Sequence, residues 1–168
     1  MGTALPILFN MIKRLISKIY QANKFVSLIL TNENKDLLVS QRSNIKKPMN
    51  GYYQCPGGHI EPNETTHDAL KRELFEETGI EFDSEQMTLE FVFKYTKQGF
   101  NYLPTKPYVF TKRTVYVYKL KTYSKDIEQD LVQDTEKENF TQWIWKTIND
   151  LQKERCITSL EKYIQDEL

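Results

Sequence analysis

Three glutamates, Glu73, Glu76 and Glu77, are the residues whose spacing best supports chemistry. In an α-helix, positions three and four apart share a face, so these carboxylates are expected to lie close together. Carboxylates at such short range repel one another and resist ionisation unless a cation neutralises them. Mg²⁺ takes oxygen ligands and keeps water and substrate phosphates in its remaining positions, and Mn²⁺ accepts similar ligands. The spacing therefore predicts a magnesium or manganese site on one face of a helix.

The segment Thr65–Thr78 carries the signals of a helix that would position those glutamates. Thr65 or Thr66 can cap its first turn, and Gly79 suits the position after its last turn. Apolar residues occupy a second face of this helix, which can pack on a sheet. A simpler interpretation of the acidic face is a solvated surface, with Lys71 and the arginine beside it as partners within the helix.

A fixed pattern around this helix decides between the two interpretations. The stretch from Gly58 to Ile80 follows G-x5-E-x7-R-E-U-x-E-E-x-G-U, where U is an aliphatic residue. This pattern is the Nudix box, and because every position matches, the chain resembles the Nudix hydrolases. The resemblance implies an α+β fold, the Nudix α/β/α sandwich, in which a mixed sheet is packed between helices.

The resemblance also implies a set of metal ligands. Glu73, Glu76 and Glu77 correspond to the metal-binding glutamates of the box, and Glu73 is also the candidate to activate water. The backbone carbonyl of Gly57 resembles the one that joins the metal shell in the family. A further acidic ligand often comes from a later loop, where Glu136 is our candidate.

Two other box residues, Arg72 and Glu64, are expected to form an ion pair that orients the glycine loop against the helix. We include both in the catalytic set that the resemblance implies. Further along the chain, Thr96–Phe110 contains a glycine and two prolines and is expected to be a long loop. Its aromatic residues Phe100 and Tyr102 are candidates to contact a nucleobase, and the alternative is that they pack on the sheet.

The implied reaction is hydrolysis of a pyrophosphate bond in a nucleoside diphosphate linked to a group X. The stretches Gly51–Gly58 and Glu136–Trp145 resemble the MutT-like nucleoside triphosphate diphosphatases. We therefore expect a (d)NTP or an oxidised (d)NTP to be cut to a nucleoside monophosphate and pyrophosphate. ADP-ribose, sugar nucleotides and mRNA caps stay open as substrates. The alternative from another functional class is a module that binds a nucleotide without cleaving it. This alternative predicts loss of metal-binding glutamates, and none is lost.

Periodic apolar and β-branched residues predict the elements around this unit. The expected strands are Phe25–Thr31, Asp36–Gln41, Tyr52–Cys55, Met87–Tyr95, Thr114–Leu120 and Phe140–Trp145. Besides the glutamate helix, a helical turn is expected at Ile148–Leu151 and a helix at Thr158–Asp166.

The composition is that of one ordinary globular domain, and the resemblance implies a small-molecule partner. Among the 168 residues, 23 basic and 23 acidic side chains cancel, which disfavours a protein that holds nucleic acid mainly through its phosphates. We expect a small nucleotide as the partner, without a stable nucleic-acid complex and without a membrane. Cys55 and Cys156 lack the spacing of a zinc site and are expected to be free thiols.

A basic segment at residues 1–23 precedes the Nudix domain, which we expect at 24–168. No acidic residue occurs before Glu33, and apolar residues of this segment recur at helical spacing. A helix packed on the domain is the expected structure, and a mitochondrial transit peptide is the alternative. Accordingly, we expect a cytoplasmic location, with the mitochondrion as the alternative.

Overall fold

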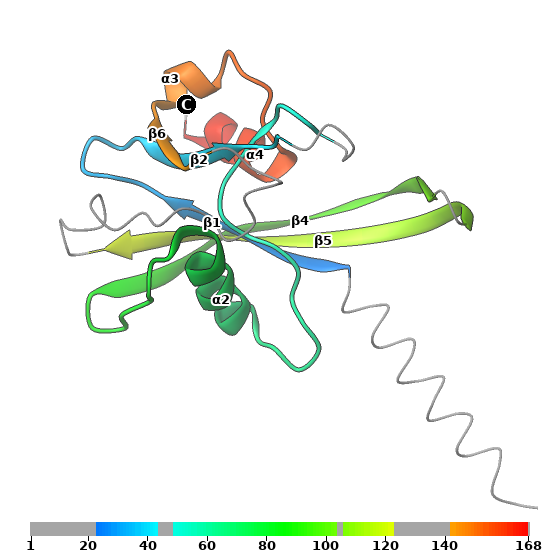
Figure 1. Cartoon of the computed structure of the whole chain (residues 1–168), viewed down its shortest axis with the longest axis horizontal. Helices are drawn as coiled ribbons and strands as arrows, with labels where there is room; N and C mark the ends of the chain where they lie inside the picture. The colour runs from blue at the N-terminus through cyan, green and yellow to red at the C-terminus, as the bar shows by residue number, and fades with distance from the viewer. Residues whose placement is uncertain (1–22, 44–48, 104–105, 123–141, 168) are drawn as a thin grey trace, which may run out of the picture.

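The computed structural model describes residues 23–43, 49–103, 106–122 and 142–167, with only the backbone described for 99–103 and 106–111. Its strands are β1 (Lys24–Leu30), β2 (Leu37–Gln41), β3 (Tyr53–Gln54), β4 (Met87–Leu103), β5 (Lys106–Thr122) and β6 (Ile144–Lys146). Its helices are α2 (Thr66–Thr78), α3 (Ile148–Leu151) and α4 (Thr158–Asp166) (Figure 1). These helices begin and end within one residue of the predicted positions.

Two three-stranded sheets form the centre of the domain, with strand orders β1-β5-β4 and β3-β2-β6. β1 pairs with β5 in parallel, from Lys24 opposite Thr114 to Leu30 opposite Leu120. The β4–β5 pair and both pairs of the second sheet are antiparallel. The strands are therefore mixed in direction, as expected for the α/β/α sandwich.

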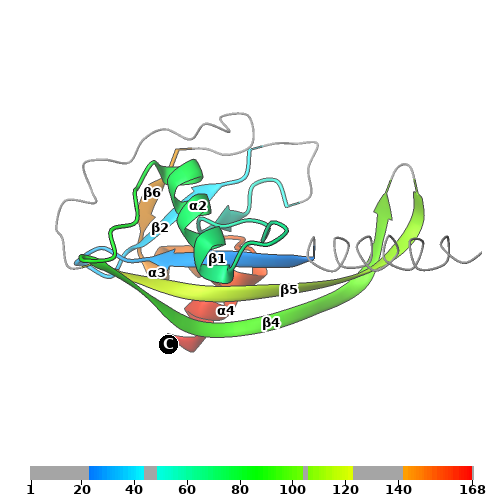
Figure 2. The ribbon, with the colours of Figure 1, turned by 90° about the horizontal axis from the view of Figure 1, so that it is seen from below.

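Burial on both faces explains the continuous apolar run of β1. Because side chains alternate along a strand, Val26, Leu28 and Leu30 enter one apolar cluster, whereas Ile29 enters a second cluster. α2 packs on the first cluster, and α3 and α4 pack on the second, so helices cover opposite sides of the strands (Figure 2). The helix residues in the two clusters are Ala69, Leu70 and Leu74 from α2, and Leu151, Leu160, Tyr163 and Ile164 from α3 and α4.

The loop expected at Thr96–Phe110 is wrong, because this stretch forms the far half of a long β-hairpin. β4 and β5 pair from Met87 opposite Thr122 to Leu103 opposite Lys106, with two register shifts. The end of this hairpin projects beyond the rest of the domain (Figure 1).

Gly99 and Pro107 indicate a loop in the sequence, but both are tolerated in the hairpin. Pairing between β1 and β5 begins only at Thr114, so the earlier residues of β5 have an unpaired edge. A proline on such an edge removes few sheet hydrogen bonds, and Pro107 also lies at an irregularity of the ladder. In this stretch the β-forming residues around Gly99 and Pro107 therefore outweigh the tendency of glycine and proline to interrupt a strand.

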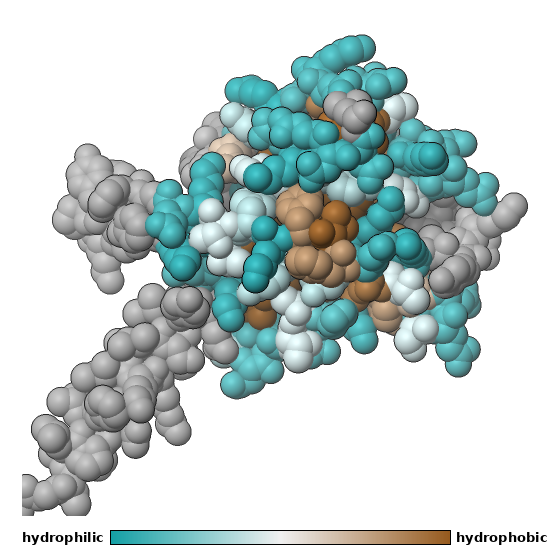
Figure 3. All heavy atoms as spheres, turned by 180° about the vertical axis from the view of Figure 1, so that it is seen from behind, coloured by the Kyte–Doolittle hydropathy of each residue, from teal (hydrophilic) through white to brown (hydrophobic). Residues whose placement is uncertain are grey.

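The described surface is that of an ordinary globular domain. None of the helices within the described ranges is long and apolar enough to cross a membrane. The face opposite that of Figure 1 is largely hydrophilic, with one apolar patch near its centre (Figure 3). Five large apolar side chains, from four separate segments, are more than a third exposed: Met49, Phe75, Phe91, Val92 and Ile144.

Several sequence predictions fall on parts of the chain that are not described. The basic N-terminal segment lies outside the described residues, as do Glu136 and the start of the strand expected at Phe140–Trp145. Cys55 and Cys156 are free thiols, as predicted. Burial raises the pKa of the Cys55 thiol, which leaves it a poor nucleophile.

Candidate active site

The glycine loop after β3 is bound to the edge of β1. The amide of Val26 donates to the carbonyl of Gly58 at 2.9 Å, and that of Leu28 donates to the carbonyl of Pro56 at 2.8 Å. Gly57, between them, has φ of 151°, and a Cβ atom there would lie 2.3 Å from the Val26 carbonyl oxygen. The amide of Gly57 does not pair with β1 and donates instead to a glutamate of the following helix.

Local capping fixes both ends of α2. The side chain of Thr65 accepts a hydrogen bond from the amide of Asp68 at 3.1 Å, and Asp68 bonds back to Thr65. Gly79 has φ of 75°, and its amide donates to the carbonyl of Phe75 at 2.8 Å. The predicted cap residues are confirmed. Because they fix where the helix begins and ends, they also fix the directions in which the glutamate side chains point.

Arg72 binds the loop and two of the glutamates together. Its Nε and Nη2 donate to the two carboxylate oxygens of Glu64 at 2.9 and 3.0 Å, a bidentate pair. Its Nη1 donates to Glu73 at 2.8 Å and to Glu76 at 2.9 Å. Its Nη2 also donates to the carbonyl of His59 at 2.8 Å. The pair predicted between Arg72 and Glu64 is thus present. The contacts of Arg72 with Glu73 and Glu76 are those that the simpler interpretation expected within the helix, and the contact with the His59 carbonyl is one that the sequence did not predict.

Glu73 lies directly against the glycine loop. A Cβ atom on Gly58 would lie 2.3 Å from Oε1 of Glu73, so only glycine leaves room for this carboxylate. Burial raises the pKa of Glu73, repulsion from Glu76 and Glu64 adds to the rise, and Arg72 opposes it. Additional positive charge near Glu73 would therefore stabilise its ionised carboxylate.

Glu77 is buried at the last turn of α2 and is held from two sides. Its Oε2 accepts a hydrogen bond from the amide of Gly57 at 2.8 Å. Its backbone carbonyl accepts one from the indole Nε1 of Trp143 at 2.6 Å, and only 4% of Trp143 is exposed. No sequence signal linked Trp143 to the glutamate helix.

One cleft of about 700 Å³ brings the predicted loop and helix residues together, since Gly57, Arg72, Glu73, Glu76 and Glu77 all line it. Within the described part of the chain, no three His, Cys, Asp or Glu side chains are grouped closely enough to hold a metal ion. The reason is that a nitrogen of the arginine lies between two of the carboxylates, and a loop amide takes the third. The donor set nevertheless fits a hard divalent cation, because carboxylate and carbonyl oxygens are the ligands such a cation prefers.

The same cleft is also lined by residues that the sequence did not single out as a group. The rings of Phe25 and His59 lie 4.1 Å apart between centroids, and the guanidinium of Arg113 lies 5.8 Å from the Phe25 ring. Nearby, Arg42 Nη1 donates to the Gln54 side-chain oxygen at 2.9 Å. Burial lowers the pKa of His59, and the positive charges of Arg113 and Arg72 lower it further. His59 is nevertheless an exposed residue outside the named strands and helices, and it lines this cleft.

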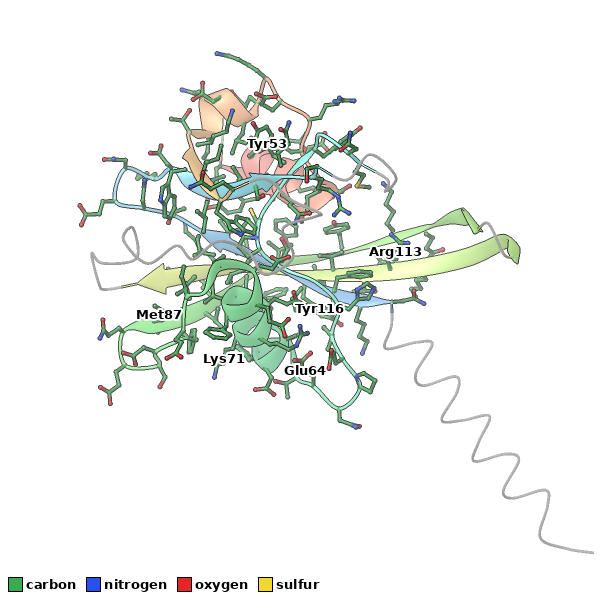
Figure 4. The ribbon with its side chains drawn as sticks, viewed as in Figure 1. Tyr53, Glu64, Lys71, Met87, Arg113 and Tyr116 are labelled. Atoms are coloured by element: carbon green, nitrogen blue, oxygen red, sulfur yellow. The ribbon has the colours of Figure 1, made fainter. Side chains whose placement is uncertain are left out.

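Figure 4 shows the two sides of this arrangement. Glu64 lies beside the start of α2, whereas Arg113 lies on β5 where the hairpin leaves the domain. Arg113 follows a long run of residues, from 91 onward, that contains no aspartate or glutamate. This run is the sequence signal that could have pointed to Arg113. Phe100 and Tyr102 belong to the backbone of β4, and their side chains are outside the described part.

Proteins of known activity match parts of this chain. An 8-oxo-dGTP diphosphatase from Proteus vulgaris is 41% identical over 61 residues, which is 36% of this chain and 52% of that protein. An ADP-ribose pyrophosphatase from Methanocaldococcus jannaschii is 40% identical over 52 residues, 31% of this chain and 29% of that protein. An RNA pyrophosphohydrolase from Pseudomonas putida is 42% identical over 62 residues, 37% of this chain and 36% of that protein. The chain therefore spans about half or less of these relatives' lengths.

Comparison with solved structures and family models extends to nearly the whole domain. The E. coli dihydroneopterin triphosphate pyrophosphohydrolase superposes with a TM-score of 0.64 at 20% identity, over 89% of this chain and 97% of that one. Identity at this level shows a common fold only. The family model of the NUDIX domain matches residues 23–166. Since that match covers most of the chain and includes the loop, the helix and the cleft, the chain belongs to the NUDIX domain family, the Nudix hydrolases.

Proposed function

We propose that this chain is a magnesium-dependent hydrolase that cleaves the pyrophosphate bond of a nucleoside diphosphate linked to a group X. Its preferred substrate is a (d)NTP or an oxidised (d)NTP, cut to a nucleoside monophosphate and pyrophosphate. One observation carries this proposal: Glu73, Glu76 and Glu77 all line the same cleft. Arg72 holds the first two carboxylates, and the amide of Gly57 holds the third. A solvated acidic face would not be tied to a glycine loop in this way.

Each polar group of the loop-helix unit has a proposed role. Glu73, Glu76, Glu77 and the carbonyl of Gly57 would hold the cation, which when bound neutralises phosphate charge and lowers the pKa of the attacking water. Glu73 is also the candidate to accept the proton of that water, because its carboxylate lies between the glycine loop and Arg72 at the cleft. Arg72 occupies Oε1 of Glu73, so the proton goes to Oε2.

Three other residues that line the cleft support a nucleotide as the substrate. Phe25 and His59 provide flat surfaces for a base, and Arg113 provides a cation for a phosphate. The 8-oxo-dGTP diphosphatase among the relatives supports a triphosphate, whereas two other relatives are named for ADP-ribose and RNA. For that reason ADP-ribose, sugar nucleotides and RNA ends are included in the test.

The experiment is a substrate screen with product identification. NTPs, dNTPs, 8-oxo-dGTP, ADP-ribose, sugar nucleotides and capped RNA are each incubated with Mg²⁺, Mn²⁺ or EDTA. We expect hydrolysis only with a divalent cation, and a higher kcat/KM for a triphosphate than for ADP-ribose. A faster reaction with ADP-ribose or a sugar nucleotide would overturn the substrate but keep the chemistry. Binding without any turnover would favour the non-catalytic module.

A matched pair of variants separates this enzyme from a contaminant. Glu77→Gln removes a buried carboxylate of the proposed metal site, and we expect a loss of turnover of about a thousandfold. Glu76→Gln is expected to behave similarly. Glu85→Gln changes an exposed glutamate away from the cleft and should retain full turnover. Near-native rates for both cleft variants would show that the helix is merely an acidic surface.

A further inference from the structure

Gln54 is a buried polar residue of the cleft to which the proposed reaction gives no role. It is the last residue of β3, it lines the cleft, and only 4% of it is exposed. Gly57, whose carbonyl belongs to the proposed cation site, follows three residues later. Three residues of extended chain span at most about 11 Å. Gln54 is therefore within reach of a nucleotide whose phosphates are held at the cation.

The side-chain oxygen of Gln54 is already occupied. Arg42 Nη1 donates to Oε1 of Gln54 at 2.9 Å. A guanidinium has only N–H donors and no acceptor, so turning the amide of Gln54 round would place donors against donors. Arg42 therefore fixes the orientation of the amide, with the oxygen toward the guanidinium and the NH2 group away from it.

The NH2 group of Gln54 donates no hydrogen bond to any of the residues that the structure describes. The other buried polar side chains of the cleft differ in this respect, since Ser27 donates to Ser159 at 3.3 Å and Glu77 accepts from the amide of Gly57. Buried donors are rarely left without an acceptor, because the lost bond to water is then not replaced. A ligand that brings an acceptor would complete this site.

An amide that can only donate reads a nucleobase differently from a free one. A glutamine that uses both of its groups pairs with adenine at the 6-amino group and N7. With Oε1 held by Arg42, Gln54 only donates, as an arginine does, and arginine pairs with the acceptors O6 and N7 of guanine. An amino group on the base would face the NH2 group of Gln54, donor against donor. The Arg42–Gln54 pair therefore favours an oxo group on the base over an amino group.

We propose that Gln54 selects nucleotides whose base carries an oxo group in place of an amino group, and that Arg42 is the positioning residue that imposes this choice. This inference rests on the proposed function, because it names the base of the nucleotide that is cleaved in the same cleft. The rings of Phe25 and His59 do not make this choice, since stacking tolerates every base. The oxo group can belong to a purine at C6 or to a pyrimidine at C4, and both present the same acceptor.

The test uses two pairs of substrates that differ in this group and in the proton of the adjacent ring nitrogen. Inosine triphosphate and ATP are the purine pair, UTP and CTP are the pyrimidine pair, and each is assayed with Mg²⁺. We expect kcat/KM to be about tenfold higher for the oxo member of at least one pair, which identifies the ring. Equal values within both pairs, or a preference for the amino members, would overturn the inference and leave the hydrolase intact. No hydrolysis of any nucleotide would overturn the proposed function instead.

Variants connect the preference to the amide. Gln54→Leu keeps a similar volume without the donors, so the ratio of kcat/KM between the oxo and amino members should fall to near one. Gln54→Glu presents only acceptors and keeps the contact with Arg42, so it should invert the ratio. Gln86→Leu changes an exposed glutamine outside the cleft and should keep the wild-type ratio. Thermal melting checks that each variant is folded, and a ratio that survives Gln54→Leu in a folded protein would contradict the proposal.

Arg42→Ala separates positioning from a purely structural role. Arg42 is only half-buried, and without its guanidinium the amide of Gln54 is free to turn and accept from an amino group. The ratio should therefore fall toward one. General damage to the fold would lower kcat/KM for both members alike and leave the ratio unchanged. An unchanged ratio in folded Arg42→Ala would overturn the role of Arg42.

Direct binding gives a readout that does not depend on turnover. The monophosphates of the same four bases are titrated in EDTA by isothermal titration calorimetry. The wild type should bind the oxo member of one pair about tenfold more tightly than the amino member, and Gln54→Leu should bind the two alike. Equal affinities in the wild type would show that water, and not a base, accepts from the NH2 group of Gln54.

Discussion

Trp143 holds the end of the helix that carries Glu77. Its indole Nε1 donates a hydrogen bond of 2.6 Å to the backbone carbonyl of Glu77, while the Glu77 side chain accepts a bond from the amide of Gly57. A residue 66 positions further along the chain therefore fixes the last turn of the glutamate helix. This contact connects the strand before α3 with the proposed metal site.

Trp143→Phe should lower both stability and turnover. The substitution leaves a buried carbonyl without its donor, which costs about 1–3 kcal/mol of unfolding free energy. The released helix end should also shift Glu77, so kcat should fall by more than the loss of folded protein explains. Denaturant unfolding and turnover are measured side by side, with Trp145→Phe as the neighbouring control. Unchanged kcat in a destabilised Trp143→Phe variant would show that the contact is only structural.

Gly58→Ala and Gly57→Ala should fail in different ways. A Cβ atom at Gly58 meets the mobile end of Glu73, whereas one at Gly57 meets the backbone of β1 at 2.3 Å. The first variant should therefore melt close to the wild type but lose turnover, because Glu73 must move. The second should unfold at a lower temperature. Normal turnover of Gly58→Ala would contradict the role of Glu73 in the site.

Arg72→Ala should damage structure and catalysis together. It removes the partner of Glu64 and of Glu73, whose side chains are only 13% and 12% exposed. A loss of about 2 kcal/mol in unfolding free energy is expected, with a large loss of kcat. Arg72→Lys keeps the charge but not the bidentate fork, so it should restore stability only in part. Thermal melting and turnover that both match the wild type would show that Arg72 is a surface cation.

The ion pair of Glu64 should make stability depend on acid. Its hydrogen bonds to Arg72 lower the pKa of Glu64 from its ordinary value of 4.5. The stabilisation is thus present above pH 4.5 and is lost as the pH falls through the lowered value of the folded state. Unfolding is followed against pH for the wild type and Glu64→Gln. The difference between them should shrink below pH 4.5, and a constant difference would exclude the linkage.

The glutamate helix was the most predictable part of this protein, because its signals are local. Thr65 and Gly79 cap it within a few residues, and the spacing of its carboxylates follows from helix geometry alone. The other lining residues of the cleft were not predictable in the same way. Phe25, His59 and Arg113 come from three distant segments. The parallel pairing of β1 with β5 brings Arg113 near Phe25, and an antiparallel bridge places His59 opposite Phe25.

The hairpin shows a different limit of sequence interpretation. Gly99 and Pro107 favour a loop, although the residues around them favour a strand. Whether a proline interrupts a strand depends on which edge is paired, and that is known only from the tertiary structure. A sum of charge over the whole chain likewise does not report how charge is distributed along it, and residues 91–125 carry no aspartate or glutamate.

The parallel pairing of β1 with β5 also determines when the domain can be completed during its synthesis. Lys24 pairs with Thr114, 90 residues later, so β1 and α2 leave the ribosome before their central strand exists. At roughly 5–20 residues per second, the apolar face of α2 stays without its finished sheet for seconds. A chain truncated before residue 114 therefore lacks the strand with which β1 pairs, and its cleft cannot be completed.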